Sequence, residues 1–482
     1  DKKIKNFYYN NKFKHIFIYE NNNYESEKKD AKIIKKKINF YKPSHIIVDD
    51  YRLGQIWEKK VKTKILKLIV IDDFIDRKHK CDYYVNFKNF ENFEYKQLNK
   101  IISKKTKKIL GHRYSIINSK LKKISKIKKN TKNIVFYPGN SGNPIIFYDI
   151  LIKLLKKINA NSLSVKINFF LGKKKTIPSK FVKLCNKYNN LKVIKNKFNL
   201  YKYLNNADLF IGFSGNLIYE NSYLKLVSIF FPISSNQNNS IHNLESLGHY
   251  FIMKKTDLKY SNKISNLIHK ILVSPELKEK MFFKNSQVTK NGKGLILKEI
   301  LDFKYNKKKL IKKITTKSKI NNNFKVSKTS IQDINNYLYC RNKKINRKYM
   351  INKKEISNLE HYNWWLNDFQ NRENFNISIE DRKIFVWHKL IKINDNKYLV
   401  GGWFSSGADI PINYKIATIK WQLEYTKKYK ARWIAVIKKN NIATFKTNTL
   451  LGWKKSSKND RIFKDTKLYF NVSTKLYYLM HY

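Results

Sequence analysis

Cysteine is scarce in this sequence, and long apolar runs are missing. The three cysteines among 482 residues, Cys81, Cys185 and Cys340, lie far apart in the chain. This spacing excludes a disulfide framework and a clustered zinc site, and it is typical of a reducing compartment. No apolar run reaches the roughly 18 residues that a membrane-spanning helix needs, and no signal-peptide pattern opens the chain. We therefore expect a cytoplasmic protein with no metal and no membrane insertion.

Acidic residues are also scarce, with 35 Asp and Glu against 101 Lys and Arg and a net charge of +66. Only nine of the 101 basic residues are arginine, and the lysines are spread along the whole chain. Surfaces that bind nucleic acid favour arginine and concentrate their charge. Lys, Asn and Ile share A/T-rich codons, so a compositional bias explains the charge. We expect no nucleic-acid partner, although the positive field would attract an anionic substrate.

The order of expected elements predicts an α/β chain of several domains. This length suggests two to four domains, and a hydrophobic content of 42% is ample for their cores. Strands expected at 14–19, 45–49 and 65–72 alternate with helical stretches, and a second such set begins with a strand at 133–137. Alternation of this kind favours parallel sheets. We expect two Rossmann-like lobes, at residues 1–125 and 126–302.

The last third of the chain has a different pattern. Residues 303–323 are rich in Lys and Asn with little apolar periodicity, which is typical of a linker. Residues 324–482 then combine expected helices, such as 416–429, with expected strands, such as 397–404. We expect an α+β domain that folds independently of the lobes.

Residues 207–237 carry the most informative local pattern. A buried strand (209–212) leads through a turn of small residues (213–216) into a helix, and a second apolar strand (227–231) follows. Such a turn points backbone N–H groups into the cleft, where they can bind a phosphate. Glu220 lies on the first turns of the helix, where its carboxylate could accept hydrogen bonds from a ribose. The alternative is an ordinary strand–helix corner with a surface glutamate.

This segment, ADLFIGFSGNLIYE, resembles the nucleotide-sugar loop of the PseG family, ADLAIGAGGSTTWE. That family consists of UDP-sugar hydrolases of pseudaminic acid synthesis, whose second lobe is that of a MurG-like glycosyltransferase. The resemblance implies a glycosyltransferase-B-like fold and a UDP-sugar substrate. It also implies that turn residues of the second lobe bind this substrate, namely Gly139, Asn140, Ser214, Gly215, Asn216, Glu220, Asn236 and Gln237.

Motifs of the first lobe resemble the same family. VDDYRLGQIWE at 48–58 and VIDDFIDRKHKCDYYVN at 70–86 match its patterns VDhYxLdxxWE and VIDDLADRxHxCDLLLDQ. Asp50 and Tyr51 follow a strand end, where cleft residues lie in open parallel sheets. The resemblance implies that both are catalytic, and the alternative for Tyr51 is a cap over the sheet edge.

Two further features of this lobe bear on its chemistry. We expect Asp72 and Asp73 to hold a turn through side-chain hydrogen bonds, and His79 to lie in a solvated loop. The family's catalytic histidine belongs to a GxGHxxR turn after its first strand, and no such motif occurs here. Hydrolysis needs a base that activates water. Either this sequence begins at a point that follows the GxGHxxR turn in the family's pattern, or the protein has lost its general base.

The third unit resembles the GNAT acetyltransferases, specifically the sugar N-acetyltransferase that acts one step earlier in the same pathway. SIQDINNYLYCRNKKINRKYM at 330–350 and ISNLEHYNWW at 356–365 match the start of that family, and NIATFKTNTLLGW at 441–453 follows its NxASxxLYEKLGF pattern. The resemblance implies an acetyl-CoA cofactor, bound by residues that include Ala417, Asn441 and Thr444.

Two departures from that family bear on the cofactor. Its pyrophosphate loop, RGxGxG/A, is replaced by INYKIATIK at 412–420, which lacks the glycines that allow close backbone approach. Its general-acid tyrosine is replaced by Asn448. We therefore expect a GNAT-like fold that binds acetyl-CoA weakly. Glu360 and His361 occupy a matched EH pair, for which helix anchoring and catalysis are equal alternatives.

Together these patterns predict a fusion of two neighbouring activities in the synthesis of nonulosonate (pseudaminic-acid-type) surface sugars. One is a hydrolase that releases UDP from a UDP-diacetamido-trideoxyhexose, and the other is an appended N-acetyltransferase-like domain. Two alternatives stay open. The first is a UDP-sugar glycosyltransferase, because the second lobe is shared with such enzymes. The second is a catalytically degenerate protein that binds sugar nucleotides.

Overall fold

The computed structural model describes most of the chain, and it divides the chain into two compact units. One unit comprises residues 1–119 and 287–306, and the other comprises residues 120–286 and 307–482. The predicted strand at 14–19 and the predicted linker at 303–323 lie outside the described residues. The described residues are 26–122, 133–139, 143–172, 176–195, 200–232, 241–274, 277, 281, 288–301, 324–379, 382–407 and 410–482.

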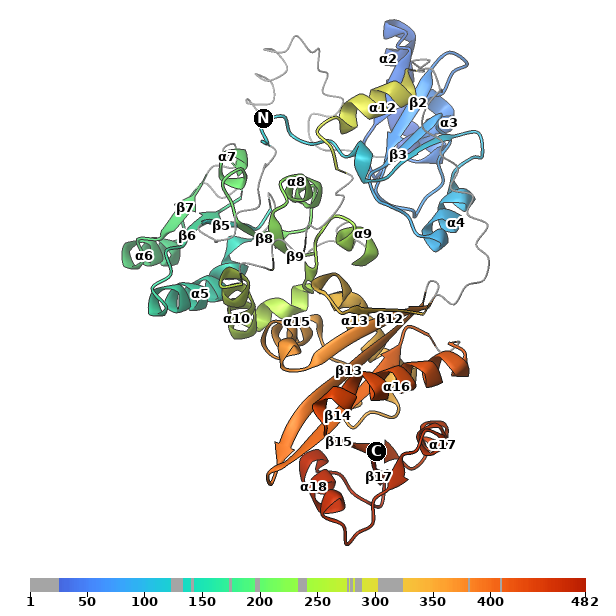
Figure 1. Ribbon diagram of the computed structural model, residues 1–482. Helices are drawn as coiled ribbons and strands as arrows, with labels where there is room; N and C mark the ends of the chain where they lie inside the picture. Colours follow the sequence, from blue (N-terminus) through green and yellow to red (C-terminus); the bar gives the residue numbers. More distant parts are fainter. Residues whose placement is uncertain are drawn as a thin grey trace. The chain divides into compact units, whose positions relative to one another are not determined.

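Unit 1 is built on a four-stranded parallel sheet of order β1-β2-β3-β4 (Figure 1). The predicted strands at 45–49 and 65–72 are confirmed as β1 and β2, whereas β3 and β4 were not predicted. All four residues of β3 are buried, as in a strand covered on both faces. The elements are α2 (Glu27–Tyr41), β1 (His45–Val48), α3 (Gln55–Val61), β2 (Lys67–Ile71), β3 (Tyr83–Asn86), α4 (Asn92–Ile101), β4 (Lys107–Leu110) and α12 (Gly292–Ile300).

Helix α12 belongs to unit 1 although it follows the second lobe in sequence. The Tyr83 hydroxyl donates to the Ile300 carbonyl oxygen at 3.0 Å, and the Lys107 ammonium lies 3.1 Å from the Glu299 carboxylate. A Cβ atom on Gly292 would lie 2.0 Å from the Ser115 carbonyl oxygen, so only glycine allows this close approach. The predicted lobe boundary at residue 302 therefore differs from the structure, in which the chain returns to unit 1 before that point.

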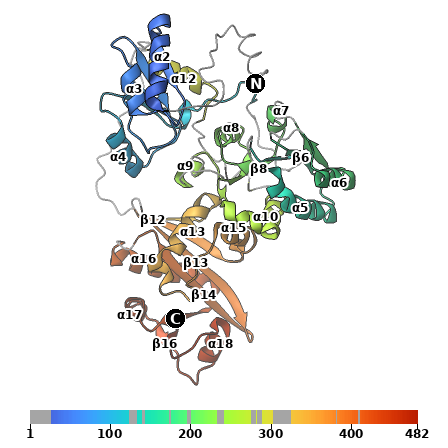
Figure 2. The ribbon, with the colours of Figure 1, turned by 180° about the vertical axis from the view of Figure 1, so that it is seen from behind.

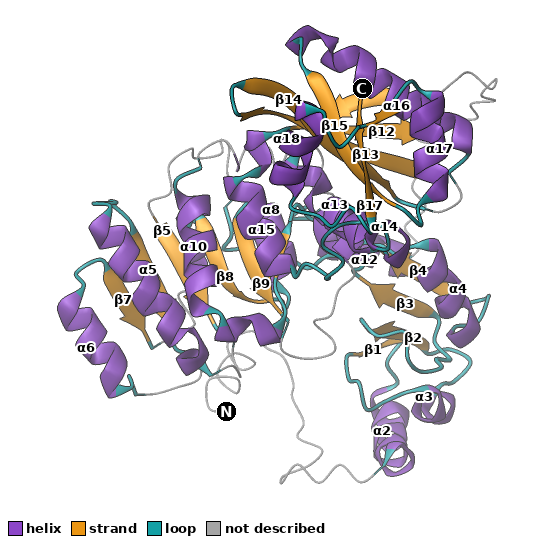
Figure 3. Cartoon of the chain, turned by 90° about the horizontal axis from the view of Figure 1, so that it is seen from below, coloured by secondary structure: helices purple, strands orange, loops and turns teal. Residues whose placement is uncertain are grey.

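The first half of unit 2 is a six-stranded parallel sheet of order β10-β9-β8-β5-β6-β7. Helices lie along this sheet in the view of Figure 3. Strands β8 and β9 are buried at every position, as central parallel strands are. The elements are β5 (Asn133–Tyr137), α5 (Tyr148–Ala160), β6 (Lys166–Phe170), α6 (Ser179–Lys187), β7 (Leu191–Ile194), α7 (Leu200–Leu204), β8 (Leu209–Phe213), α8 (Leu217–Tyr223), β9 (Val227–Phe231), α9 (Ile241–Glu245), β10 (Phe251–Ile252) and α10 (Ser261–Leu272).

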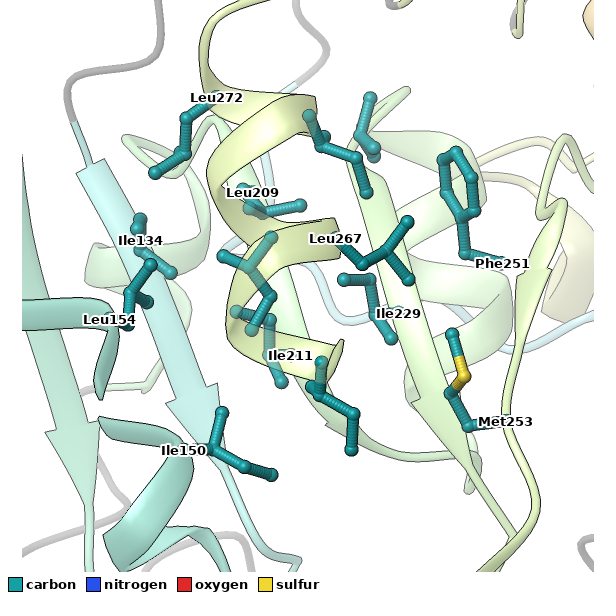
Figure 4. Packing of buried hydrophobic residues seen from close by; sticks show 14 of the residues in the cluster. Ile134, Ile150, Leu154, Leu209, Ile211, Ile229, Phe251, Met253, Leu267 and Leu272 are labelled. Carbon is teal, nitrogen blue, oxygen red and sulfur yellow. The ribbon is translucent and has the colours of Figure 1, made fainter. Parts of the chain in front are cut away.

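Helix α10 shows how the apolar pattern of one helix covers this sheet. Its buried residues recur at the spacing of a single helical face, and they include Ile264, Leu267, Ile268 and Ile271. In Figure 4 this helix crosses over the strands that carry Ile211 and other labelled side chains. The sheet and the helix thus share one apolar layer, which fixes the carboxyl ends of the strands relative to each other.

The second half of unit 2 is a seven-stranded sheet of order β11-β12-β13-β14-β15-β17-β16. All its neighbouring strands are antiparallel except β14 and β15. Asn394 and Asp395 turn β13 into β14 with positive φ at both positions, as a type I′ hairpin requires. The elements are β11 (Lys325–Lys328), α13 (Ile334–Asn342), α14 (Lys344–Arg347), α15 (Asn358–Asn367), β12 (Glu373–Ile379), β13 (Arg382–Ile393), β14 (Asn396–Ser405), α16 (Ile412–Thr426), β15 (Arg432–Lys438), α17 (Ile442–Leu450), β16 (Lys454–Lys455), α18 (Arg461–Phe470) and β17 (Tyr477–His481).

The two halves of unit 2 share one hydrophobic core. Helices α10 and α15 lie side by side, as Figures 1 and 2 both show. The Tyr362 hydroxyl donates to the Asn335 side-chain oxygen at 2.5 Å, and the Asn335 amide donates to the Tyr250 carbonyl oxygen at 3.1 Å and to the Glu245 carboxylate at 2.9 Å. The ring of Phe251 meets Tyr362 edge to face. This packing contradicts the expectation that residues 324–482 fold independently of the second lobe.

The predicted fold class is confirmed. The chain is α/β, with two Rossmann-like parallel-sheet lobes followed by a mixed, mainly antiparallel sheet with helices. Within the described ranges, every helix is too short or too polar to span a bilayer.

The shared core leads to a prediction for Tyr362→Ala. Because truncation of a fully buried aromatic side chain leaves a cavity, the variant should lose about 3–5 kcal/mol of stability. The loss should appear in both halves of unit 2. Hydrogen exchange followed by mass spectrometry should show faster exchange in β9 and in β13 together.

Tyr469→Ala is the matched control, because Tyr469 is 42% exposed on α18. Tyr469→Ala should leave the hydrogen-exchange rates of β9 and β13 nearly unchanged. Unchanged protection of β9 in Tyr362→Ala, alongside faster exchange in β13, would show that the two halves fold separately.

Candidate functional site

The sheet of the second lobe has a topological switch point between β5 and β8. From β5 the chain proceeds outward through β6 and β7, and it then returns to β8 and proceeds the other way through β9 and β10. In open α/β sheets, ligands bind outside the carboxyl ends of the strands at this point. The turns that follow β5 and β8 are those of the predicted substrate residues Gly139 and Ser214–Asn216.

Two glycines allow the turns to approach each other. Gly212 pairs with Tyr137 across β8 and β5, and a Cβ atom on Gly212 would lie 2.2 Å from the Tyr137 carbonyl oxygen. Gly139 has a φ of +72°, which favours glycine, and its Cβ direction points at the Phe213 ring 3.4 Å away. The structure therefore brings the two predicted turns together at the switch point.

The hydrogen bonds of the second turn decide which N–H groups can reach a ligand. The Ser214 N–H donates to the Phe231 carbonyl oxygen at 3.4 Å, and the Gly215 N–H donates to Phe213 at 3.1 Å. No bond from the N–H groups of Asn216 and Leu217 occurs among the described residues. Open space surrounds the Cβ direction of Gly215. Asn216 and Leu217 are thus the donors available to a phosphate, while Gly215 provides the room for it.

Glu220 lies on α8, close to the end of β5, and it is 7% exposed. Burial raises the pKa of the Tyr137 hydroxyl, and the neighbouring Tyr201 and Glu220 raise it further. His249 anchors helix α8, because its Nε2–H donates to the Ile218 carbonyl oxygen at 2.7 Å. Burial lowers the pKa of His249 to about 4, so the imidazole is neutral in this role. Three predicted substrate residues, Asn140, Asn236 and Gln237, lie outside the described residues.

In unit 1 the carboxyl ends of β1 and β2 carry a group of acidic side chains. Asp50 is engaged by Arg52, whose guanidinium lies 2.6 Å from its carboxylate and whose backbone N–H donates to it at 2.9 Å. These hydrogen bonds lower the pKa of Asp50. Burial raises the pKa of the neighbouring Asp49, and the charges of Asp73, Asp50 and Asp72 add to this. The Asp50 carboxylate is thus engaged by Arg52, and its catalytic role stays a prediction, whereas the pKa of Asp49 is shifted toward that of a proton acceptor.

Tyr51 lies at the same edge and is 47% exposed. Its ring meets the Phe74 ring edge to face with centroids 5.0 Å apart, and the Arg77 guanidinium lies 5.9 Å from its centroid. The arrangement is compatible with both predicted roles of Tyr51, because one side of the ring covers the sheet edge and the other side remains accessible.

The expectation that His79 is a solvated residue is wrong, because its side chain is 1% exposed. Its Nδ1 lies 2.6 Å from the Glu58 carboxylate and its Nε2 lies 3.0 Å from Asp72. Asp72 also pairs with Arg77 at 2.7 Å and accepts the Phe74 N–H at 2.9 Å, which confirms its predicted role in a turn. Two cations and two carboxylates form a buried group without net charge. No residue spacing in the sequence revealed this network, since Glu58 lies in a different segment from Asp72, Arg77 and His79.

Burial by itself would lower the pKa of His79, but hydrogen bonds to Asp72 and Glu58 outweigh burial and raise this pKa to about 9. The imidazolium form therefore links helix α3, which carries Glu58, to the end of β2, which precedes Asp72. This ion network holds the edge where Asp49 and Tyr51 lie.

In the GNAT-like half, strands β14 and β15 diverge after a short paired segment. Only Tyr398 with Arg432 and Leu399 with Trp433 are in register, although both strands continue well beyond these pairs. Of the predicted cofactor residues, Asn441 caps helix α17 by accepting the Thr444 N–H at 3.4 Å, and Ala417 lies within α16. Asn441 and Thr444 are thus brought together at the end of β15.

The EH pair of this half has an anchoring role. Glu360 forms a capping box with Ser357 at the start of α15 and lies 3.3 Å from the Lys263 ammonium. His361 is buried, and its Nε2–H donates to the Ile334 carbonyl oxygen at 2.8 Å. Burial lowers the pKa of His361 to about 4. Of the two alternatives drawn from the sequence, these contacts favour helix anchoring.

The network of His79 leads to a prediction on pH. Since the folded state raises the pKa of His79 from 6.5 to about 9, the folded chain keeps a proton that the unfolded chain loses. This stabilisation is complete below pH 6.5, and it is lost as the pH rises through 9. Hydrogen exchange of the β2 segment in urea, measured over this pH range, should show the loss.

His79→Gln should remove this pH dependence and cost about 3–5 kcal/mol, because it leaves buried carboxylates without their partner. An unchanged pH dependence in His79→Gln would assign the effect to another group.

Comparisons with known proteins return solved structures of low sequence identity. No protein-family profile matches the chain, and no curated protein resembles it significantly in sequence. The MurG structure from Acinetobacter baumannii is 15% identical with a TM-score of 0.38, and the match covers 57% of this chain and 78% of that one. The UDP-GlcNAc 2-epimerase from Neisseria meningitidis bound to UDP-GlcNAc is 11% identical with a TM-score of 0.42, covering 62% and 89%. An acetyltransferase of the GNAT family from Streptococcus pneumoniae is 8% identical with a TM-score of 0.25, covering 33% and 98%.

Proposed function

We propose that the second lobe binds a UDP-sugar at the switch point between β5 and β8. The observation that carries this proposal is the meeting of the Gly139 turn with the Ser214–Asn216 turn at that point. The N–H groups of Asn216 and Leu217 are the proposed donors to the diphosphate. The Glu220 carboxylate is the proposed acceptor for the ribose hydroxyl groups.

The reaction that we propose is hydrolysis, in which water attacks the anomeric carbon and UDP leaves. The support is the series of sequence motifs shared with the PseG family, and the proposed substrate is a UDP-diacetamido-trideoxyhexose of nonulosonate synthesis in the cytoplasm. A carboxylate with a raised pKa can take the proton from the water. Asp49 in unit 1 is a carboxylate of this kind.

This reaction is tested by measuring UDP release. The full-length chain should release UDP from the UDP-diacetamido sugar in the absence of any acceptor, and the free sugar should appear in equal amount. Release of UDP only after an acceptor glycan is added would replace hydrolysis by glycosyl transfer. Binding of UDP without release from the sugar would favour the catalytically degenerate alternative.

Gly215→Val tests the binding site itself. The new side chain meets no protein atom within 4 Å of its Cβ, so the fold should tolerate it, and the side chain should occupy the space proposed for the diphosphate. UDP affinity measured by calorimetry should fall at least about tenfold, or about 1.4 kcal/mol.

Asn206→Val is the matched control, because Asn206 is exposed at the opposite end of β8. Its UDP affinity should equal that of the wild type. Wild-type affinity in a folded Gly215→Val variant would refute the proposed site.

We propose further that acetyl-CoA binds weakly where β14 and β15 diverge, for N-acetyl transfer to an amino sugar. The divergence provides room for the pantetheine arm, and Asn441 lies at the end of β15. The cofactor would supply the acetyl group. Helix α16 begins after Pro411 without a side-chain cap, and its first turn contains no glycine, so few close contacts to a pyrophosphate are possible.

The contribution of the pyrophosphate can be measured directly. Titrated into the full-length chain, acetyl-CoA should bind no more than about tenfold more tightly than acetyl-pantetheine, which lacks the pyrophosphate. A glycine-rich loop would add several charge-assisted hydrogen bonds of roughly 1.5–3 kcal/mol each. Acetyl-CoA binding that is thousands of times tighter would show that α16 holds the pyrophosphate without glycines.

A further inference from the structure

A pocket of about 540 Å³ lies beside α18, at the start of β17. Four of its lining residues are lysines that come from three separate segments, namely Lys439, Lys455, Lys458 and Lys475. Two serines and a threonine add hydroxyl groups, and no carboxylate lines the pocket among the described residues. The carboxylate of Asp460 lies beside the pocket, where it accepts the N–H of the lining residue Ser457 at 3.1 Å.

Two of these lysines are held in place by an aromatic ring. The ammonium groups of Lys439 and Lys455 lie 5.7 and 5.5 Å from the centroid of the Tyr478 ring. Cation–π contacts of this kind orient the charged ends without neutralising them. Within the described residues, none of the four pocket lysines forms an ion pair. The pocket is therefore a site of concentrated positive potential.

A second lysine group lies on the face of the sheet that carries Tyr477, opposite the face that carries Tyr478. Lys438 pairs with Tyr477 across β15 and β17, so both side chains point to the face that carries the pocket residue Tyr477. Lys353 and Lys348, from the segment after α14, converge on Lys438 and lower its pKa. Like charges that converge from distant segments repel each other, and a bound anion would relieve this repulsion.

None of the residues predicted for acetyl-CoA, Ala417, Asn441 and Thr444, lines the pocket. Helix α16 packs on the sheet face that carries Trp433 and Ile437, whereas α18 packs on the opposite face with Ile434. The pocket residue Leu479 pairs with Val436 and so shares the face of Ile434. Tyr478 pairs with Ile437, and Lys455 pairs with Met480, so both share the face on which α16 packs. The pocket therefore takes its lining residues from both faces of the sheet.

We propose that the pocket binds the phosphate or diphosphate group of a small molecule. Lysine ammonium groups bind phosphate oxygens as point charges, and the serine and threonine hydroxyls supply further donors. Two sources share this chemistry, a nucleotide sugar and a phosphorylated cofactor. The binding is independent of the UDP site in the second lobe, because no residue of that lobe lines the pocket.

The test uses lysine labelling of the full-length chain with an amine-reactive acetylating reagent at physiological salt. Inorganic pyrophosphate should slow the labelling of Lys455, Lys458 and Lys475 about tenfold, saturably, as read by peptide mass spectrometry. Lys464 and Lys467, exposed on α18 outside the pocket, should label at an unchanged rate. The same labelling is repeated with UDP and with CoA in place of pyrophosphate. The compound that protects these lysines at the lower concentration identifies the source of the phosphate group.

A variant pair separates this pocket from the general charge of the chain. Lys455→Gln with Lys475→Gln should abolish the protection of Lys458. Lys464→Gln with Lys467→Gln removes the same charge and should retain that protection. Absence of protection in the wild type would overturn the proposal, and so would equal protection of Lys464 and Lys467, since the chain would then attract anions without a defined site.

Discussion

The close approach of β5 and β8 is the constraint on which the rest of the second lobe depends. A parallel sheet that reverses its strand order leaves a crevice at the reversal, and the turns that follow the two strands border it. Gly212 permits the approach, because any side chain there would collide with the Tyr137 carbonyl oxygen. The positive φ of Gly139 then directs the first turn toward the second. The proposed UDP-sugar site is a consequence of this packing.

Charge has different roles in different parts of the chain. In unit 1, the buried His79 and the partly exposed Arg77 are balanced by Glu58 and Asp72, so the network stabilises the edge of the sheet without net charge. Such a group is costly to bury unless every member is paired. In the GNAT-like half, the lysines of the pocket beside α18 lack carboxylate partners among the described residues. The same excess of lysine is thus dispersed over most of the chain and also gathers at this pocket.

The shared core of unit 2 connects the two proposed activities physically. Tyr362 and Asn335 belong to residues 324–482, but they bond to the segment around β10 in the second lobe. Burial raises the pKa of Glu245 to about 7 in this interface, and the Asn335 amide partly offsets that rise by donating to the carboxylate. A change that loosens either half should therefore be felt in the other. Within unit 2, the second lobe and residues 324–482 therefore form one folded body with a shared core.

By itself, the sequence determined the alternation of strands and helices, the turn of small residues after β8 and the α/β class, because these depend on local periodicity and on turn residues. Only the tertiary structure decided the return of α12 to unit 1, the burial of His79 and the shared core around Tyr362. Each of these depends on contacts between residues far apart in the chain, such as Glu58 with His79 or Tyr83 with Ile300. Local propensity carries no information about such contacts, since the free energy that selects them comes from packing and charge pairing in the folded chain.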